Sequence, residues 1–257
     1  ELMISGSSSS SSSSSTAAAV PYASCAADPI STARHAQLLI RSLKCCGKLA
    51  GDPRQLHADA VRKGLFPTDH RITTSLVYTY FKCNAITEAQ QAFQHLPSRD
   101  VVSWSALICG CAQHGLAREA IRCFRIMEQE GITPDAITFV CILKACAMIG
   151  AGEKGEEIHA MMERVQLLGK NMVLSNALID MYAKCGLLEK AQKVFNELPH
   201  KDIVSWSALI TGYTQHGHGE WALRCFDEMK SEGFSPNPIT FISSLKACSS
   251  IGALDKG

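Results

Sequence analysis

The sequence DVVSWSALICGCAQHG, residues Asp100 to Gly115, returns 102 residues later as DIVSWSALITGYTQHG, residues Asp202 to Gly217. A segment that recurs at a fixed spacing is the signature of a repeat array and not of a single globular core. In such an array each repeat buries its apolar face against its neighbours. The recurrence therefore predicts that the rest of the chain consists of related units.

Each unit is predicted to be a pair of helices. In the first copy, apolar residues stand at i, i+3, i+4 and i+7, which is one face of a helix: Trp104, Leu107, Ile108 and Cys111. His114 and Gly115 then end that helix, because glycine suits the left-handed position after a helix terminus. A second apolar stripe follows and stops at Gly131 and Pro134. On this basis Trp104 and Trp206 are assigned to the core, and His114 and His216 to helix ends.

The spacing of these stripes divides the chain into units of 35, 36 and 31 residues. The predicted fold is all-α, a right-handed superhelical solenoid of helix-turn-helix repeats similar to tetratricopeptide arrays. The expected units are 34–69 (with a register that the spacing leaves open), 70–100, 101–135, 136–171, 172–202, 203–237 and a partial unit at 238–257. The first of these is placed by His57-Ala58, which matches His159-Ala160. Because the sequence begins at Glu1 and ends inside a unit at Gly257, we expect it to be a fragment at both ends.

Residues 1–33 differ in composition from the rest, with an unbroken serine run from Ser7 to Ser15. A segment this poor in large apolar side chains cannot offset its chain entropy by burial, so we expect a disordered tail. It can be interpreted as the remnant of a Ser-rich organelle transit peptide or as a plain flexible tail. Glu1, Asp28 and the lack of Lys or Arg before Arg34 count against the transit peptide.

Several function classes are disfavoured by composition. The net charge is +1, which by itself does not argue for nucleic-acid binding, and no apolar run is long enough to span a bilayer. The twelve cysteines contain no CxxC pair, so we expect reduced, packing cysteines and no zinc site, as in a reducing compartment. No Walker loop, GxSxG, HEXXH or zinc-deaminase signature is present. The sequence thus predicts no catalytic residue, no metal site and no cofactor.

The 35–36–31 alternation of unit lengths and the sequences of the units resemble the P, L and S motifs of plant PLS-type pentatricopeptide repeat (PPR) proteins. VSWSALITGYTQHG followed by ALRCFDEMKSEGFSPN is similar to a P motif, and ITFVCILKACAMIGAGEKGEEIHA is similar to an L motif. LSNALIDMYAKCGLLEKAQKVFNELPHKD is similar to an S motif. The resemblance covers about residues 34–257. It implies a solenoid that binds single-stranded RNA and reads one base per repeat.

In this family the fifth residue of a repeat and its last residue select the base together. Carried over, the base-selecting pairs are Thr74 with Asp100, Ser105 with Asp135, Asn176 with Asp202, and Ser207 with Asn237. They imply preferences for G, G, U and A, and the base opposite Val140 and Asn171 stays open, so the expected footprint is G-G-N-U-A. Without the repeat context, these side chains would be only polar groups on a helix surface, and the Asp residues would be N-caps.

The second residue of each repeat is implied to pack on base faces, namely Val102, Val173 and Val204, whereas Arg71 departs from this aliphatic pattern. Lys82 and Lys184 are candidate phosphate contacts, with helix-dipole stabilisation as the alternative.

The family also implies a role in C-to-U editing or processing of organellar RNA, in a mitochondrion or chloroplast. Chemistry would come from a deaminase-like domain after the repeats, from editing-complex proteins or from a deaminase-bearing partner, and no membrane is implicated. The alternative class is a protein-binding scaffold like the tetratricopeptide solenoids, which would not need polar pairs at those two positions. A third interpretation is a truncated product without a stable function.

Overall fold

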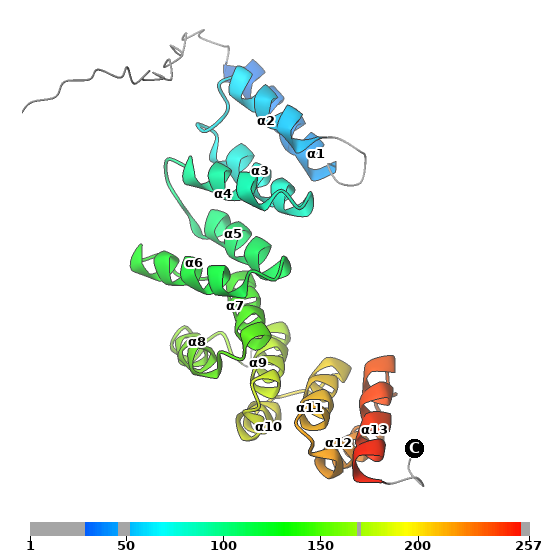
Figure 1. The fold of residues 1–257 in the computed structure, drawn as a ribbon. Helices are drawn as coiled ribbons and strands as arrows, with labels where there is room; N and C mark the ends of the chain where they lie inside the picture. The colour runs from blue at the N-terminus through cyan, green and yellow to red at the C-terminus, as the bar shows by residue number, and fades with distance from the viewer. Residues whose placement is uncertain (1–28, 46–51, 169–170, 253–257) are drawn as a thin grey trace, which may run out of the picture.

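The computed structural model describes residues 29–45, 52–168 and 171–252, and within these residues it is all-α (Figure 1). Its helices are α1 (Pro29–Cys45), α2 (Pro53–Arg62), α3 (His70–Lys82), α4 (Ile86–Gln94), α5 (Val101–Gln113), α6 (Ala117–Gln129), α7 (Ala136–Ile149), α8 (Gly152–Arg164), α9 (Met172–Lys184), α10 (Leu188–Asn196), α11 (Ile203–Gln215), α12 (Gly219–Ser231) and α13 (Pro238–Ile251).

The helices alternate in position along the array. We call the odd-numbered helices the lead helices and the even-numbered ones the trailing helices. Each lead helix packs against the next lead helix, and each trailing helix packs against the lead helices that precede and follow it. The pairs therefore stack one after another from α1 and α2 to α13, as Figure 1 shows. This confirms the predicted class, a solenoid of helix-turn-helix repeats.

Acidic and amide side chains begin the lead helices. The residue before each lead helix from α3 to α13 accepts a backbone N–H of the first turn through its side chain: Asp69, Asp100, Asp135, Asn171, Asp202 and Asn237. Such N-caps satisfy donors that have no partner inside the helix. These lead helices start at residues 70, 101, 136, 172, 203 and 238.

The two tryptophans of the recurring segment lie in the core, as predicted. Trp104 is 2% exposed and Trp206 is 0% exposed. Each ring packs edge-on against a phenylalanine of the preceding trailing helix, Phe93 or Phe195, with ring centroids 4.7 and 4.6 Å apart. The predicted helix ends also hold, because His114 and His216 are the C-caps and the following Gly115 has a φ of 77°.

The N-terminal boundary differs from the expectation. Helix α1 begins at Pro29, inside the stretch 1–33 that was assigned to the tail, while residues 1–28 lie outside the described residues. Proline is well accommodated at the first helical position, because its missing N–H has no partner there in any case. The sequence match of His57 to His159 corresponds to the same contact in both units. Nδ1 of His57 lies 2.7 Å from the Tyr80 hydroxyl, and Nδ1 of His159 lies 2.8 Å from the Tyr182 hydroxyl.

Two glycines let neighbouring lead helices approach closely. A Cβ built on Gly110 of α5 would lie 2.2 Å from the Phe81 ring of α3. One built on Gly212 of α11 would lie 2.5 Å from Cβ of Ala183 on α9. Because Phe81 and Ala183 occupy the same place in their units, the same contact is made twice with side chains of different size.

The cysteine prediction is wrong for two residues. Cys109 of α5 and Cys141 of α7 form a disulfide, with Cα atoms 5.1 Å apart. Neither belongs to the buried stripe of its helix, so spacing along the chain gave no sign of the pair. The two meet only because α5 and α7 lie side by side. Seven further cysteines are free, and five of these are buried: Cys111, Cys123, Cys146, Cys225 and Cys248.

Candidate functional site

A row of exposed aliphatic side chains runs along the lead helices. Val102, Val173 and Val204, each at the second position of its unit, are 57%, 63% and 54% exposed. Ile137 and Ile239 hold the same position in the 36-residue units and are 63% and 58% exposed. We call the surface marked by these five residues the lead-helix face. The sequence analysis missed the two isoleucines, although the shared register of the units points to them.

The structure brings Ser105 and Asp135 together on this face. The Ser105 hydroxyl lies 3.2 Å from Oδ1 of Asp135 and also contacts the hydroxyl of Thr138 at 2.5 Å. The same Oδ1 accepts the backbone N–H and the hydroxyl of Thr138, at 2.8 and 2.7 Å. The three bonds to Asp135 all fall on Oδ1, and none of them involves Oδ2. The residue at the unit's end thus caps one helix and pairs with the helix before it.

Two further pairs are also joined by hydrogen bonds. The amide nitrogen of Asn176 donates to both carboxylate oxygens of Asp202, at 3.2 and 3.0 Å. Its carbonyl oxygen is buried and has no partner among the described residues. In the next unit the amide nitrogen of Asn237 donates to the Ser207 hydroxyl at 3.0 Å, while Oδ1 of Asn237 accepts the backbone N–H of Thr240.

The remaining positions are not joined in this way. No hydrogen bond links Thr74 to Asp100 in the described part of the chain, and the Thr74 hydroxyl is buried without a partner there. Asp100 instead forms a capping box with Ser103, in which the Asp100 carboxylate accepts the Ser103 N–H and the Ser103 hydroxyl accepts the Asp100 N–H. Nε2 of His70 lies 3.4 Å from Oδ1 of Asp100. Val140 is half-buried on α7, whereas Asn171 caps α9 through the N–H groups of Val173 and Leu174.

A groove of about 640 Å³ is cut into the lead-helix face between α7 and α13. Its walls carry the exposed residues Val173, Val204 and Ile239, and Asn176, Asp202 and Ser207 also line it. The groove combines apolar walls with a few convergent polar groups, which is the usual composition of a ligand site.

Lys184 and Lys144 line this groove, and Lys82 holds the place of Lys184 on α3. Lys184 donates to Asp180 at 2.8 Å, one turn earlier on the same helix, and its side chain is 42% exposed. Lys82, at the matching place on α3, lies 4.8 Å from the centre of the Tyr78 ring. Lys144 of α7 is exposed at the edge of the groove and was not singled out from the sequence.

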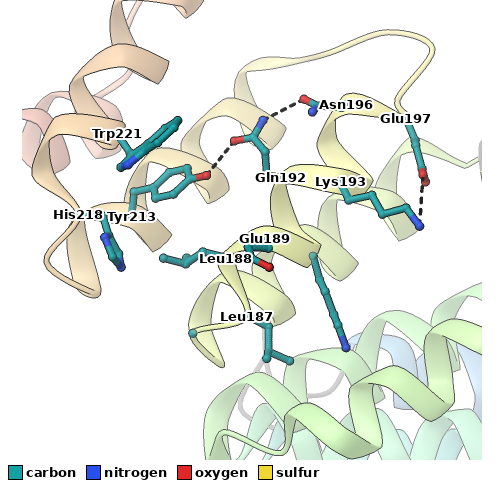
Figure 2. Close-up of a pocket in the computed structure, with 12 residues that line it drawn as sticks. Leu187, Leu188, Glu189, Gln192, Lys193, Asn196, Glu197, Tyr213, His218 and Trp221 are labelled. Carbon is teal, nitrogen blue, oxygen red and sulfur yellow. Dashed lines mark hydrogen bonds and ion pairs between the residues drawn. The ribbon is translucent and has the colours of Figure 1, made fainter.

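A larger hollow of about 920 Å³ lies between α10 and α12, away from the exposed aliphatic row (Figure 2). The Trp221 ring stacks on Tyr213 there, and the Tyr213 hydroxyl donates to Oε1 of Gln192 at 2.9 Å. One period earlier, Cys111 and Glu119 stand where Tyr213 and Trp221 stand here. The aromatic lining of the hollow is therefore particular to one unit, whereas the polar pairs recur along the array.

No cluster of three or more His, Cys, Asp or Glu side chains suited to a metal ion occurs within the described ranges. Among the described helices, none has the length and apolar character needed to cross a membrane.

Comparisons with known proteins bear on the same stretches. The model of the PPR repeat family matches residues 99–148 and 201–250, and the PPR repeat model matches residues 173–203. The chloroplastic protein CRR2 of Arabidopsis thaliana is 41% identical over 206 residues, which are 79% of this chain and 31% of CRR2. The mitochondrial protein At3g11460 of the same plant is 37% identical over 204 residues, covering 79% of this chain and 32% of that protein. The chain therefore spans about a third of the length of these relatives.

The crystal structure of the pentatricopeptide repeat protein PPR10 in complex with an 18-nt psaJ RNA element has the same fold. It superposes with a TM-score of 0.65 at 20% identity, over 90% of this chain and 36% of PPR10. Helix pairs, recurring sequence and matched family models agree, and the chain is a PPR repeat protein related to the pentatricopeptide repeat proteins of Arabidopsis thaliana.

Proposed function

We propose that this chain binds single-stranded RNA along its lead-helix face and reads one base per repeat. The observation that carries the proposal is the recurrence of a hydrogen-bonded polar pair, Ser105–Asp135, Asn176–Asp202 and Ser207–Asn237, beside an exposed aliphatic side chain in each unit. A peptide-binding scaffold has no need to repeat such pairs at one register. PPR10, which shares the fold, is known in a complex with an RNA element.

The chemistry of the pairs supports different bases at Asp135 and Asn237. A carboxylate only accepts hydrogen bonds, whereas an amide nitrogen donates them. The Watson–Crick edge of guanine presents N1–H and N2–H donors, so it complements Oδ2 of Asp135. Adenine presents the acceptor N1, so it complements the second N–H of the Asn237 amide. We therefore assign G to the unit 101–135 and A to the unit 203–237.

The Asn176–Asp202 pair supports U. The amide nitrogen of Asn176 is held by Asp202, and its carbonyl oxygen is left as a buried acceptor. A buried polar atom without a partner costs free energy, which a ligand donor can recover. The N3–H of uracil is such a donor. With Thr74 and Asp100 assigned to G by their place in the repeat, the footprint is G-G-N-U-A.

The aliphatic row gives each base a place to lie. Val173 and Val204 face the groove from successive units on either side of the Asn176–Asp202 pair. A base inserted there buries both of its faces against apolar side chains, and this contribution does not depend on its identity. Val102, Ile137 and Ile239 offer the same contact in their units.

We infer further that the array is of the PLS subtype and selects sites for C-to-U editing or processing of organellar RNA. The 35–36–31 alternation of the units and relatives named chloroplastic and mitochondrial support this assignment. Catalysis is then the task of a deaminase-like domain or partner, and the repeats select the site.

The test is a competition binding assay at a stated salt concentration, because affinity for RNA is salt-dependent. RNA that contains GGNUA should compete better than a scrambled RNA of the same composition. Equal competition by both RNAs would refute base-selective binding, and capture of a peptide ligand with no RNA binding would favour the scaffold class.

A further inference from the structure

The disulfide between Cys109 and Cys141 lies on the lead-helix face. Cys109 stands two turns after the exposed Val102 on α5, and Cys141 stands one turn after the exposed Ile137 on α7. Both residues are half-buried, whereas Cys111 and Cys146 of the same helices are buried. The Cα separation of 5.1 Å falls in the range that a disulfide spans without moving the backbone.

The same place in the next period carries a pair that is not covalent. Thr211 and Ser243 stand 102 residues after Cys109 and Cys141, and their hydroxyl oxygens lie 3.1 Å apart. Helices α11 and α13 pack side by side as α5 and α7 do. The helix contact therefore forms without a cross-link, and the disulfide is an addition to an interface that is already complete.

The cross-link sits next to one base-reading pair. Cys109 is one turn beyond Ser105, and Ser105, Asp135 and Thr138 are bonded to one another across the junction of α5 and α7. A base that pairs with Oδ2 of Asp135 lies against this junction of α5 and α7. A covalent bond one turn away resists any separation of α5 from α7.

We propose that Cys109 and Cys141 form a thiol–disulfide site that regulates RNA binding at the unit 101–135, a role that rests on the proposed function. A thiolate of a thioredoxin-class dithiol protein attacks one sulfur, breaks the Cys109–Cys141 bond and forms a mixed disulfide. The second thiol of that protein then attacks its own sulfur in the mixed disulfide and releases the bound cysteine of this chain as a thiol. Two electrons and two protons pass to this chain, which gains two thiols, and the partner's dithiol becomes a disulfide. Reduced protein binds the RNA more tightly, because α5 and α7 are free to admit the base.

The experiment compares the wild-type protein with C109T/C141S, which copies the Thr211–Ser243 pair onto the first period. Each is prepared oxidised and after treatment with a dithiol, and alkylation with mass spectrometry reports whether Cys109 and Cys141 are bonded. The dissociation constant for GGNUA-containing RNA is then measured. Oxidised wild type should bind about tenfold more weakly than reduced wild type. The variant should bind as tightly as reduced wild type in both states.

A converse variant moves the site. T211C/S243C should gain a second disulfide, and its affinity should become dithiol-dependent at the nucleotide read by Ser207 and Asn237. The regulatory proposal is overturned if oxidised wild type shows no Cys109–Cys141 peptide, or if affinity is the same in both redox states while GGNUA is still preferred over scrambled RNA. Loss of that preference in the variant and in both states of the wild type refutes the proposed function instead, and the regulatory role with it.

Discussion

Asp135, Asp202 and Asn237 each serve two helices at once. Each accepts a backbone N–H at the start of a lead helix, and each also bonds a polar side chain of the preceding lead helix. The N-cap role and the pairing role, which stood as alternatives in the sequence, therefore coexist. Substitutions at these residues will disturb folding as well as binding, so variants that preserve the cap are the informative ones.

At the exposed aliphatic positions, a substitution can change RNA affinity while leaving the stability of the fold nearly unchanged. V173A and V204A remove methyl groups from side chains that are 63% and 54% exposed, so stability should change little. RNA affinity should fall several-fold for every sequence, because apolar contact with a base face is lost while the polar pair remains. Fluorescence anisotropy with matched and scrambled RNA measures this. V61A on α2, at an exposed valine of a trailing helix, is the control and should bind as wild type does.

Lys184 poses a choice between a phosphate contact and a local ion pair with Asp180. If it meets a phosphate, K184Q weakens binding to all sequences and reduces the slope of log K against log salt by about 1. Lys190 is similarly exposed but pairs with Glu156 on α8, so K190Q should leave the slope unchanged. An unchanged slope in K184Q would reduce Lys184 to a helix-terminal charge.

At the scale of elements, close contact between lead helices depends on glycine. G110A places a methyl group against the Phe81 ring, which is fixed in the core at 2% exposure. Overpacking of this kind costs about 1–3 kcal/mol, which outweighs the gain in helix propensity from alanine. Urea unfolding should show the loss. G155A is the control, because its new methyl group meets only the flexible end of Met181; an equal loss in both variants would contradict the packing argument.

The recurring His–Tyr contact between trailing and lead helices should make stability depend on pH. Burial lowers the pKa of His159, and the nearby carboxylate of Glu163 offsets this only in part. The pKa of His57 is lowered in the same way. The unfolded chain then binds more protons than the folded one, so this contribution is complete above the unfolded pKa of about 6.5 and is lost as pH falls through the folded pKa.

The free energy of unfolding should accordingly fall between about pH 7 and pH 5. It should fall less in H159Q than in the wild type, as denaturant melts at several pH values would show. H200Q, at an exposed histidine, should keep the wild-type dependence. A steeper fall in H159Q than in wild type would contradict the assignment.

The sequence could predict the features that depend on local signals, but not those that depend on contacts between lead helices. The stripes that hold Trp104 and Phe124 follow from helical periodicity, and the helix starts follow from capping residues, because both signals are local. The Cys109–Cys141 bond and the Gly110–Phe81 contact were not foreseen, since they depend on how one lead helix lies against the next. Pro29 was missed because the end of a composition shift does not mark where a helix begins.

At the scale of the whole molecule, the array is a row of units in fixed register. In the proposed function successive lead helices read successive bases, and the exposed side chains Val102, Ile137, Val173, Val204 and Ile239 mark the spacing of the units. Such an array behaves as a sum of repeats and nearest-neighbour contacts. A change in one reading pair should therefore alter one position of the footprint and leave the others as they were.

The most direct test is N237D, assayed against RNAs that differ from G-G-N-U-A at one position each. Aspartate keeps the N-cap of α13 and turns the Ser207–Asn237 pair into a copy of Ser105–Asp135. The account predicts that preference at the last nucleotide changes from A to G by about tenfold, with the other positions unchanged. An unchanged preference at that nucleotide, or a shift at a different one, would contradict base reading in this register.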